Sequence, residues 1–237
     1  MNVRRSIEVE LFTDNAPVNS TIFVLGATGC GKTILIANLL KDRERFVIVD
    51  IKDEYPKDFF DGTIAVNQHQ DFVNALNKNV KRIIYRMPPG SDTEHTLNLL
   101  TFALYDFHRV NKNLQTTFAL DELNRFVSSH SAPRGLMEII QRGRGVGIQK
   151  IFGAQWFNQI PSWARDSFTE FFVFRHSEPR GLLMLEPYGF NAETIRALPN
   201  HHACHSLGGV TEIVRIAAIN QSTNAPSKPK QTITKQT

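Results

Sequence analysis

The sequence predicts an α/β fold in which a mainly parallel sheet carries helices on both faces. Short apolar strands alternate with helical segments along most of the 237 residues, and this order is typical of consecutive βαβ units. A glycine-rich turn joins the first buried strand to the first helix, and two acidic residues end a later buried strand. We therefore expect one domain over residues 1–220, followed by a disordered basic tail at 221–237 that is almost free of apolar residues.

The elements follow from local patterns. Residues 7–11 alternate apolar and acidic side chains, the period of a half-buried strand, whereas 21–25 and 46–50 are almost entirely apolar and predict buried strands. The glycine-rich turn opens a helix at about 32–40. In chain order we then expect a helix at 71–76, a strand at 82–86, a helix at 93–109, a strand at 116–120, a helix at 133–142, a strand at 148–154, and shorter strands at 170–174, 202–206 and 212–217 that extend the same sheet.

Composition excludes several classes of protein. Hydrophobic residues make up 41% and charged residues 21%, ordinary values for a globular domain and unlike those of a disordered or fibrous chain. The two cysteines, Cys30 and Cys204, cannot form a disulfide framework and favour a reducing compartment. The longest apolar runs fall far short of the roughly 18 residues of a membrane span, so we expect no transmembrane segment. Glu8 and Glu10 interrupt what would be the apolar region of a signal peptide.

The net charge of +4 is concentrated in the tail. The last seventeen residues contain Lys228, Lys230 and Lys235 and no acidic residue, which leaves residues 1–220 with a net charge of only +1. A global basic field is therefore absent. If the protein binds nucleic acid, localised positive loops or a composite channel must supply the contacts.

A phosphate-binding loop is the strongest motif. It matches G-x-x-x-x-G-K-[ST] between a predicted strand and a predicted helix, which is the context that the motif requires. Its residues are Gly26, Ala27, Thr28, Gly29, Cys30, Gly31, Lys32 and Thr33. Backbone N–H groups would wrap the phosphates of ATP, Lys32 would neutralise their charge, and Thr33 would offer a hydroxyl to Mg²⁺.

Polar residues end two later strands, at the edge where α/β sheets bind ligands. Asp121 and Glu122 follow the strand at 116–120. Asp121 would hold Mg²⁺ through water, and Glu122 would polarise the attacking water, a role that only a hydrolase requires. Gln155 ends the strand at 148–154 and either senses the γ-phosphate and orients the water or is a simple polar strand end.

Two arginines, Arg142 and Arg144, lie at a predicted helix end. They either satisfy the helix C-terminal carbonyls or act as arginine fingers in a neighbouring subunit's site. Arg175, Arg180 and Arg215 are alternative positions for such a finger.

Two further clusters favour structural roles. The spacing of His201, His202, Cys204 and His205 matches no standard zinc pattern, which favours a strand with partly exposed histidines. Aromatic residues at a strand exit usually bury, so Trp156, Phe157 and Trp163 favour core or interface packing over a base-stacking platform.

Four segments together resemble the FtsK/HerA superfamily of DNA-pumping ATPases over about residues 20–200. They are the phosphate loop, the strand and turn ending in Asp-x-Lys-x-Glu-Tyr at 47–55, the acidic strand end at 118–122, and the segment 142–155 followed by Ile160 and Pro161. The short chain most resembles the genome-packaging ATPases of tailless, internal-membrane double-stranded DNA viruses. This resemblance implies a RecA-like (ASCE) P-loop fold and an ATP- and Mg²⁺-dependent motor. It implies Walker A at the phosphate loop, Walker B at Asp121 and Glu122, a sensor at Gln155, and a trans finger at Arg142 or Arg144.

The same resemblance implies partners and a location. The protein would form a homo-oligomeric ring, a hexamer or pentamer. Its partners would be double-stranded DNA and capsid vertex proteins, and it would reside in the host cytoplasm and the virion. In such a ring the segment that leaves the catalytic strand, residues 124–134, is well placed to contact DNA, with Arg125, His130 and Arg134 as candidates. The lysine-bearing tail is a rival site.

Three other functions fit the motifs. One is an assembly ATPase of filamentous phage or a conjugation-type ATPase, although most such proteins carry a membrane anchor. Another is a small-molecule kinase or nucleotide-dependent switch, against which Glu122 argues, because a kinase has no water to activate. The last is a nucleotide-binding structural subunit of a capsid vertex.

Overall fold

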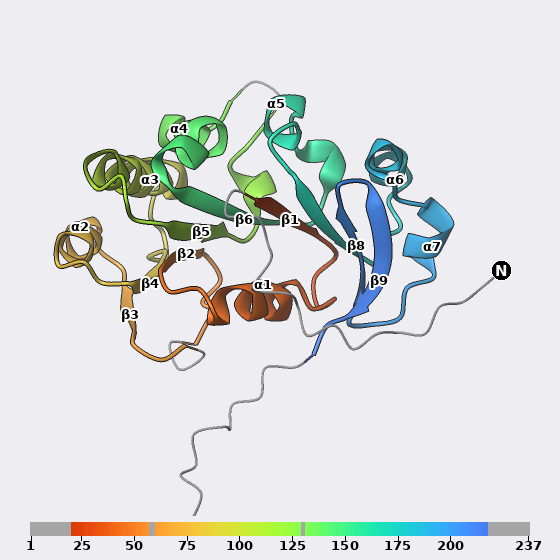
Figure 1. Ribbon diagram of the computed structural model, residues 1–237, viewed down its shortest axis with the longest axis horizontal. Helices are drawn as coiled ribbons and strands as arrows, with labels where there is room; N and C mark the ends of the chain where they lie inside the picture. Colours follow the sequence, from red (N-terminus) through yellow and green to blue (C-terminus); the bar gives the residue numbers. More distant parts are fainter. Residues whose placement is uncertain (1–19, 57–59, 129–130, 218–237) are drawn as a thin grey trace, which may run out of the picture.

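A nine-stranded sheet forms the centre of the protein (Figure 1). The computed structural model describes residues 20–56, 60–128 and 131–217, so the predicted strand at 7–11, His130 and the basic tail lie outside the described residues. The strand order is β3-β4-β2-β5-β6-β1-β7-β8-β9. The first seven of these strands run parallel, and β8 and β9 continue the sheet as an antiparallel hairpin. The predicted α/β class with extra C-terminal strands is confirmed.

The strands are β1 (Thr21–Leu25), β2 (Phe46–Asp50), β3 (Thr63–Val66), β4 (Arg82–Arg86), β5 (Thr116–Leu120), β6 (Ile148–Ala154), β7 (Glu170–Phe174), β8 (His202–Leu207) and β9 (Val210–Arg215). The α-helices are α1 (Lys32–Lys41), α2 (His69–Asn77), α3 (Thr93–Val110), α4 (Arg134–Arg142), α5 (Ser162–Arg165), α6 (Pro179–Leu185) and α7 (Ala192–Arg196).

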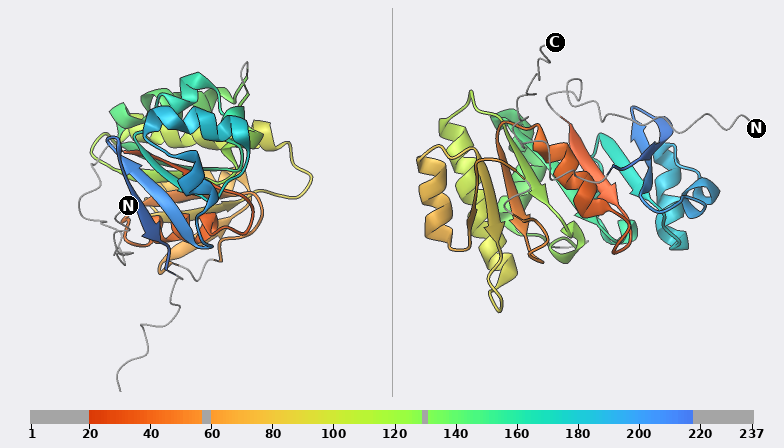
Figure 2. Two further views of the ribbon diagram at one scale, coloured as in Figure 1. Left: turned by 90° about the vertical axis from the view of Figure 1, so that its right-hand side faces the viewer. Right: turned by 90° about the horizontal axis from the view of Figure 1, so that it is seen from below.

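The two faces of the sheet are covered unequally. Along β1, Phe23 and Leu25 point to the core beneath α2 to α7, while Ile22 and Val24 point to the core beneath α1, as the two-residue period of a strand requires. Helices therefore cover both faces, but in the described part of the chain one face carries α1 alone (Figure 1). The right-hand view of Figure 2, from below, shows α1 lying against the middle of the sheet.

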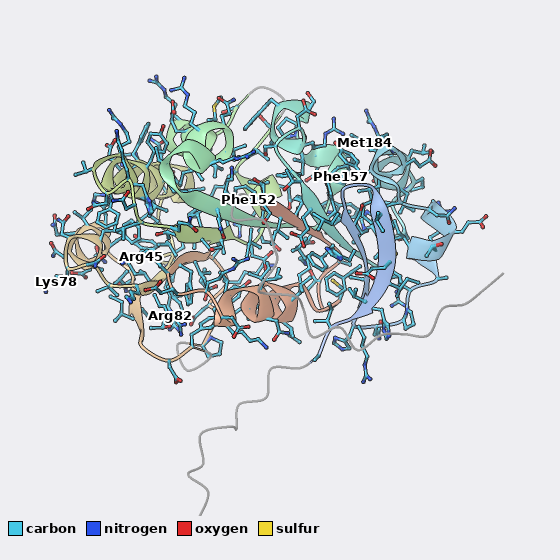
Figure 3. All side chains as sticks on the ribbon, in the orientation of Figure 1. Arg45, Lys78, Arg82, Phe152, Phe157 and Met184 are labelled. Carbon is cyan, nitrogen blue, oxygen red and sulfur yellow. The ribbon has the colours of Figure 1, made fainter. Side chains whose placement is uncertain are left out.

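The larger core is rich in aromatic rings. Phe152 and Phe157 belong to it and lie on the side of the sheet that faces α4 to α6 (Figure 3). Phe157 is fully buried, Trp163 is partly buried against the same core, and Trp156 is 41% exposed. Core packing is confirmed for Phe157 and Trp163. Trp156 does not pack in the core, and interface packing of its exposed ring stays a prediction.

Some elements differ from the sequence prediction. Strand β3 and helices α5, α6 and α7 were not expected, and the last strand begins and ends two residues earlier than the predicted 212–217. β3 has only four residues, none of them buried, so it carries no apolar run to mark it. Side-chain caps begin two of the short helices: the Glu178 side chain accepts from two N–H groups of α6, and the Asn191 side chain accepts from the Thr194 N–H of α7.

The topology gathers the sequence motifs at one edge. Strands β5, β6 and β1 are neighbours and parallel, so their C-terminal ends lie side by side. The phosphate loop follows β1, Asp121 and Glu122 follow β5, and Gln155 follows β6. β2 lies next to β5 and adds the turn at residues 50–55 to the same edge.

Candidate nucleotide-binding and catalytic site

The phosphate loop joins β1 to α1 and is held open by glycine. Gly29 and Gly31 adopt φ values of 78° and 110°, a region that favours glycine. The Gly26 N–H donates to the Ala154 carbonyl at 3.1 Å, which ties the start of the loop to the end of β6. Free N–H groups at the start of α1 can therefore face an anion, because the first turn of a helix has unpaired donors.

Lys32 and Thr33 bring complementary groups to the site. Lys32 is buried, and its Nζ donates to the Ala27 carbonyl at 3.2 Å, so the ammonium group lies inside the arch of the loop. Thr33 Oγ1 lies 3.0 Å from Glu54 Oε2 and 3.5 Å from Asp121 Oδ2. Three side-chain oxygens from three different segments converge here, and Mg²⁺ prefers hard oxygen ligands.

Asp121 fits its position because residue 153 has no side chain. A Cβ added at Gly153 would lie 2.2 Å from Asp121 Oδ1. The same oxygen accepts the Glu122 N–H at 2.9 Å. Burial raises the pKa of Asp121 and outweighs the nearby charge of Lys32, which lowers it. A cation beside this carboxylate would stabilise the ionised form that the loss of hydration disfavours.

Glu122 is held by two side-chain contacts. Its Oε1 accepts hydrogen bonds from Lys52 Nζ and from Gln155 Nε2, each at 2.6 Å. Burial favours the neutral acid, but these hydrogen bonds and the charge of Lys52 outweigh it, so the pKa of Glu122 is lowered. Glu122 also adopts φ 70° and ψ 40°, an uncommon backbone conformation for a residue with a side chain. The carboxylate is thus ionised and oriented, as a base that accepts a proton from water must be.

A tight turn after β2 delivers Lys52 and Glu54 to the site. The buried Asp50 carboxylate accepts the N–H groups of Glu54 at 3.1 Å and Tyr55 at 3.0 Å. Asp53 adopts φ 58° and pairs with Arg86 at 2.9 Å. Because the contacts of Asp50 and Asp53 fix this turn, Lys52 reaches Glu122 and Glu54 reaches Thr33.

These groups line one cleft of about 320 Å³ that opens above the phosphate loop. Its lining includes Lys32, Thr33, Lys52, Glu54, Asp121, Glu122 and His201. The glycine-rich loop fits the phosphates of a nucleotide, and Thr33, Glu54 and Asp121 fit a magnesium ion, which would neutralise phosphate charge when bound.

The histidine cluster separates in space. His201 approaches the phosphate loop, so that a Cβ at Gly31 would lie 3.2 Å from its Nδ1. His202 Nδ1 lies 2.9 Å from the Asn200 carbonyl oxygen, whereas Cys204 is buried in the core. The His205 ring stacks on the Phe172 ring, with 4.3 Å between the centroids, and its two nitrogens form hydrogen bonds with Glu170 and Glu212. Within the described ranges, no three His, Cys, Asp or Glu residues converge as a metal site.

Arg142 and Arg144 lie at the opposite edge of the sheet. Arg142 ends α4 and pairs with Glu138 at 3.1 Å, and both arginines precede the first residue of β6. β6 has seven residues, so roughly 23 Å of strand separates them from Gln155 in the same subunit. They are not brought into this chain's own cleft, and a role across a subunit boundary stays a prediction.

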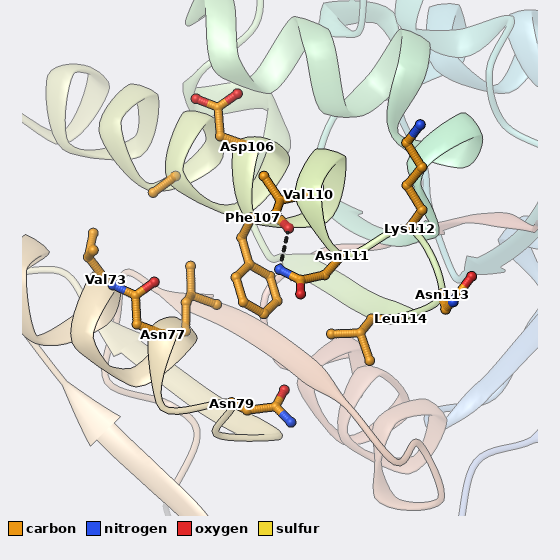
Figure 4. Close-up of a pocket in the computed structure, with 12 residues that line it drawn as sticks. Val73, Asn77, Asn79, Asp106, Phe107, Val110, Asn111, Lys112, Asn113 and Leu114 are labelled. Atoms are coloured by element: carbon orange, nitrogen blue, oxygen red, sulfur yellow. Dashed lines mark hydrogen bonds between the residues drawn. The ribbon is translucent and has the colours of Figure 1, made fainter.

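Arg125 and Arg134 are both exposed. Arg125 ends a short 3-10 helix directly after Glu122, at the site edge, and Arg134 begins α4. A wider cavity than the cleft, about 880 Å³, lies elsewhere, between the C-terminal ends of α2 and α3 (Figure 4). None of the candidate site residues lines it.

The sequence matches no protein-family model and no curated protein. Among solved structures, the genome packaging NTPase B204 of Sulfolobus turreted icosahedral virus 2, in complex with sulfate, is similar with a TM-score of 0.68 and 16% identity, over 85% of this chain and 98% of that one. The same NTPase in complex with AMPPCP gives a TM-score of 0.68 and 18% identity, over 84% and 99% of the two chains. The chain has the RecA-like P-loop NTPase fold.

Conjugation proteins share this RecA-like P-loop NTPase fold. The bacterial conjugative coupling protein TrwBdeltaN70 is similar with a TM-score of 0.60 and 13% identity, over 88% of each chain. VirB4 of Thermoanaerobacter pseudethanolicus is similar with a TM-score of 0.65 and 11% identity, over 84% of this chain and 90% of that one. The fold that the resemblance to the FtsK/HerA superfamily implies is therefore confirmed.

Three polar residues of the cleft, Lys52, Glu54 and His201, had no role assigned from the sequence. Lys52 and Glu54 belong to the segment that carries the family resemblance, and the available signal was that both follow closely after the end of a buried strand. His201 carried no signal, because its approach to Gly31 depends on how the loop before β8 folds back over the phosphate loop.

Proposed function

We propose that this protein is an ATP-hydrolysing motor that translocates double-stranded DNA, and that it packages a viral genome into a preformed capsid. The observation that carries the proposal is the position of Glu122, an ionised carboxylate hydrogen-bonded at 2.6 Å to both Lys52 and Gln155 beside a phosphate loop. A kinase or a passive nucleotide-binding subunit has no use for a base aimed at water.

Each residue has a distinct task in the proposed reaction. The loop N–H groups and Lys32 bind the β- and γ-phosphates, and Thr33 and Asp121 hold Mg²⁺. Gln155 orients a water molecule, and Glu122 accepts its proton as the water oxygen bonds to the γ-phosphorus and the bond to the β-phosphate oxygen breaks. Since Lys52 stabilises the Glu122 carboxylate, the hydrogen bond between them must weaken before Glu122 can take up that proton. Arg142 or Arg144 of a neighbouring subunit is proposed to stabilise the charge that develops.

The proposed assembly is a ring, a hexamer or pentamer, that binds DNA and capsid vertex proteins in the host cytoplasm and the virion. Similarity to the packaging NTPase B204 over 98% of that chain supports the viral assignment. Similarity to TrwBdeltaN70 and VirB4 makes a conjugation-type ATPase the second candidate. In the described part of the chain, no helix has the length and apolar character that a bilayer crossing needs.

Displacement of a third strand from a triplex on duplex DNA tests translocation. The wild-type protein should displace it with ATP and not with AMPPCP, and Glu122→Gln should not displace it with either. DNA binding without any ATP-dependent displacement would overturn the motor. A second assay mixes the protein with DNA, ATP and empty capsids and measures how much DNA is protected from DNase. A packaging motor should give protection only when capsids are present, whereas a conjugation-type ATPase should give the same result with and without them.

A further inference from the structure

A second, smaller cavity of about 260 Å³ lies beside the nucleotide cleft, on the far side of the phosphate loop. Its lining includes Ala27 of that loop, Gln155, Trp156, Arg175 and Arg196. The proposed hydrolysis uses the phosphate loop and Gln155 but gives no task to Trp156, Arg175 or Arg196. Its residues come from four segments, which follow β1, follow β6, follow β7 and end α7, so the fold assembles it from distant parts of the chain.

The cavity is cationic. Arg175 and Arg196 are both exposed, and no acidic side chain of the described chain lines the cavity. Arg175 Nη2 donates to Asn200 Oδ1 at 3.1 Å, which fixes one guanidinium without neutralising it. The Arg196 side chain has no hydrogen bond or ion pair within the described residues. Two uncompensated guanidinium groups around one hollow suit an oxyanion such as a phosphate.

An aromatic ring stands at the rim. Trp156 is 41% exposed, and its ring meets that of the buried His176 edge-on, with 5.9 Å between the centroids. The indole is therefore held in place while part of its surface stays open. Contacts to a duplex backbone are made to its phosphates and its sugars, so the exposed indole surface beside the arginines offers an apolar contact to a deoxyribose, which a free phosphate ion lacks.

The cavity is connected to the catalytic carboxylate. The Gln155 side chain donates to Glu122 Oε1, and its backbone N–H donates to Asn124 Oδ1 at 3.2 Å. Asn124 also donates to Gln159 Oε1 at 3.3 Å, so the segments after β5 and β6 are tied together. A ligand that moves Trp156 acts on the residue next to Gln155 and hence on the hydrogen bond that orients Glu122.

We infer that the cavity lined by Trp156, Arg175 and Arg196 binds a backbone phosphate of DNA and transmits its occupancy through Gln155 to Glu122. This inference rests on the proposed DNA-translocating function and adds a contact that is separate from the 124–134 loop. Strands β5 and β7, which precede the two contacts, are three positions apart in the sheet, so their ends lie on the order of 14 Å apart along one edge.

Two measurements on the full chain test the site: affinity for duplex DNA across a salt series with AMPPCP bound, and the ratio of ATP turnover with DNA to turnover without it. The double variant Arg175→Ala/Arg196→Ala should lower the salt slope by about 2 per engaged subunit and the affinity on the order of 30-fold near physiological salt. The turnover ratio should fall toward one. Arg109→Ala, which removes one arginine paired with Asp106 on α3, is the control and should match the wild type.

Further variants distinguish contact from misfolding. Trp156→Ala should weaken DNA binding without changing the salt slope, and Trp156→Phe should retain most of the binding. Arg175→Lys with Arg196→Lys should restore the slope. If the double alanine variant binds and responds to DNA like the wild type, the inference is overturned while the motor stands. If the wild type itself shows neither DNA binding nor stimulation, the proposed function fails and the inference with it.

Discussion

Replacing Gly153 by alanine perturbs Asp121 without altering any side chain that we assign to catalysis. The added Cβ would lie 2.2 Å from Asp121 Oδ1, 3.0 Å from its Cγ and 3.2 Å from Ile36 Cδ1. Ordinary contact begins near 3.4 Å, so the carboxylate must move by about 1.2 Å. The hydrogen bond that Oδ1 accepts from the Glu122 N–H cannot survive that shift unchanged, because its length is 2.9 Å.

The displacement predicts two measurable losses. A misplacement of about 1 Å at a reacting centre costs on the order of 10²-fold in rate, so turnover of Mg-ATP should fall by roughly that factor. Overpacking of a buried site costs about 1–3 kcal/mol, which corresponds to a fall of roughly 2–12 °C in the thermal midpoint for a domain of this size. Nucleotide binding in EDTA should change little, because the phosphate loop itself is untouched.

Gly145→Ala is the matched control. A Cβ at Gly145 meets nothing within 4 Å and the residue has no positive φ, so the same methyl group should leave turnover and the thermal midpoint close to those of the wild type. Phosphate release at saturating Mg-ATP and differential scanning fluorimetry measure both effects. A Gly153→Ala protein with turnover within twofold of the wild type would refute the assignment of Asp121 to the metal site.

Three further predictions follow from other contacts. Burial lowers the pKa of Lys150 to about 8, so the unfolded chain binds this proton more tightly than the folded one. The free energy of unfolding should therefore rise by about 3 kcal/mol between pH 8 and pH 10.5. Denaturation measured across this pH range should show the rise in the wild type and not in Lys150→Met. Mixed rings of Lys32→Ala with Arg142→Ala or Arg144→Ala should recover part of the ATPase activity that each variant lacks alone; no recovery in rings shown to be mixed would favour helix capping. Lys52→Met should shift the acid limb of the pH–rate profile to higher pH, since the ammonium group lowers the pKa of the catalytic glutamate; an unmoved limb would contradict this.

Local patterns explain what the sequence could predict. The phosphate loop is contiguous, and its glycines, lysine and threonine carry their roles within eight residues. Asp121, Glu122 and Gln155 were predictable because buried parallel strands end at one edge, so a polar residue after each strand lies near the others.

The remaining site residues depend on long-range geometry. Lys52 reaches Glu122 only because β2 lies beside β5 and because the Asp50 carboxylate fixes the turn that follows β2. Arg196 lines the same cavity as Trp156 through the placement of a five-residue helix that has no periodicity to reveal it. Contacts of this kind follow from sheet order and loop path, which a strand-by-strand sequence pattern does not specify.

Phosphate release by the Glu122→Gln variant, with and without duplex DNA, tests the central claim most directly. The account predicts that the wild type hydrolyses ATP faster with DNA, and that the variant binds ATP with unchanged affinity but turns it over on the order of 10²-fold or more slowly under both conditions. Glu44→Gln, at an exposed pair with Lys81, should behave like the wild type. Near wild-type hydrolysis by Glu122→Gln would contradict the assignment of the catalytic base and the motor mechanism built on it.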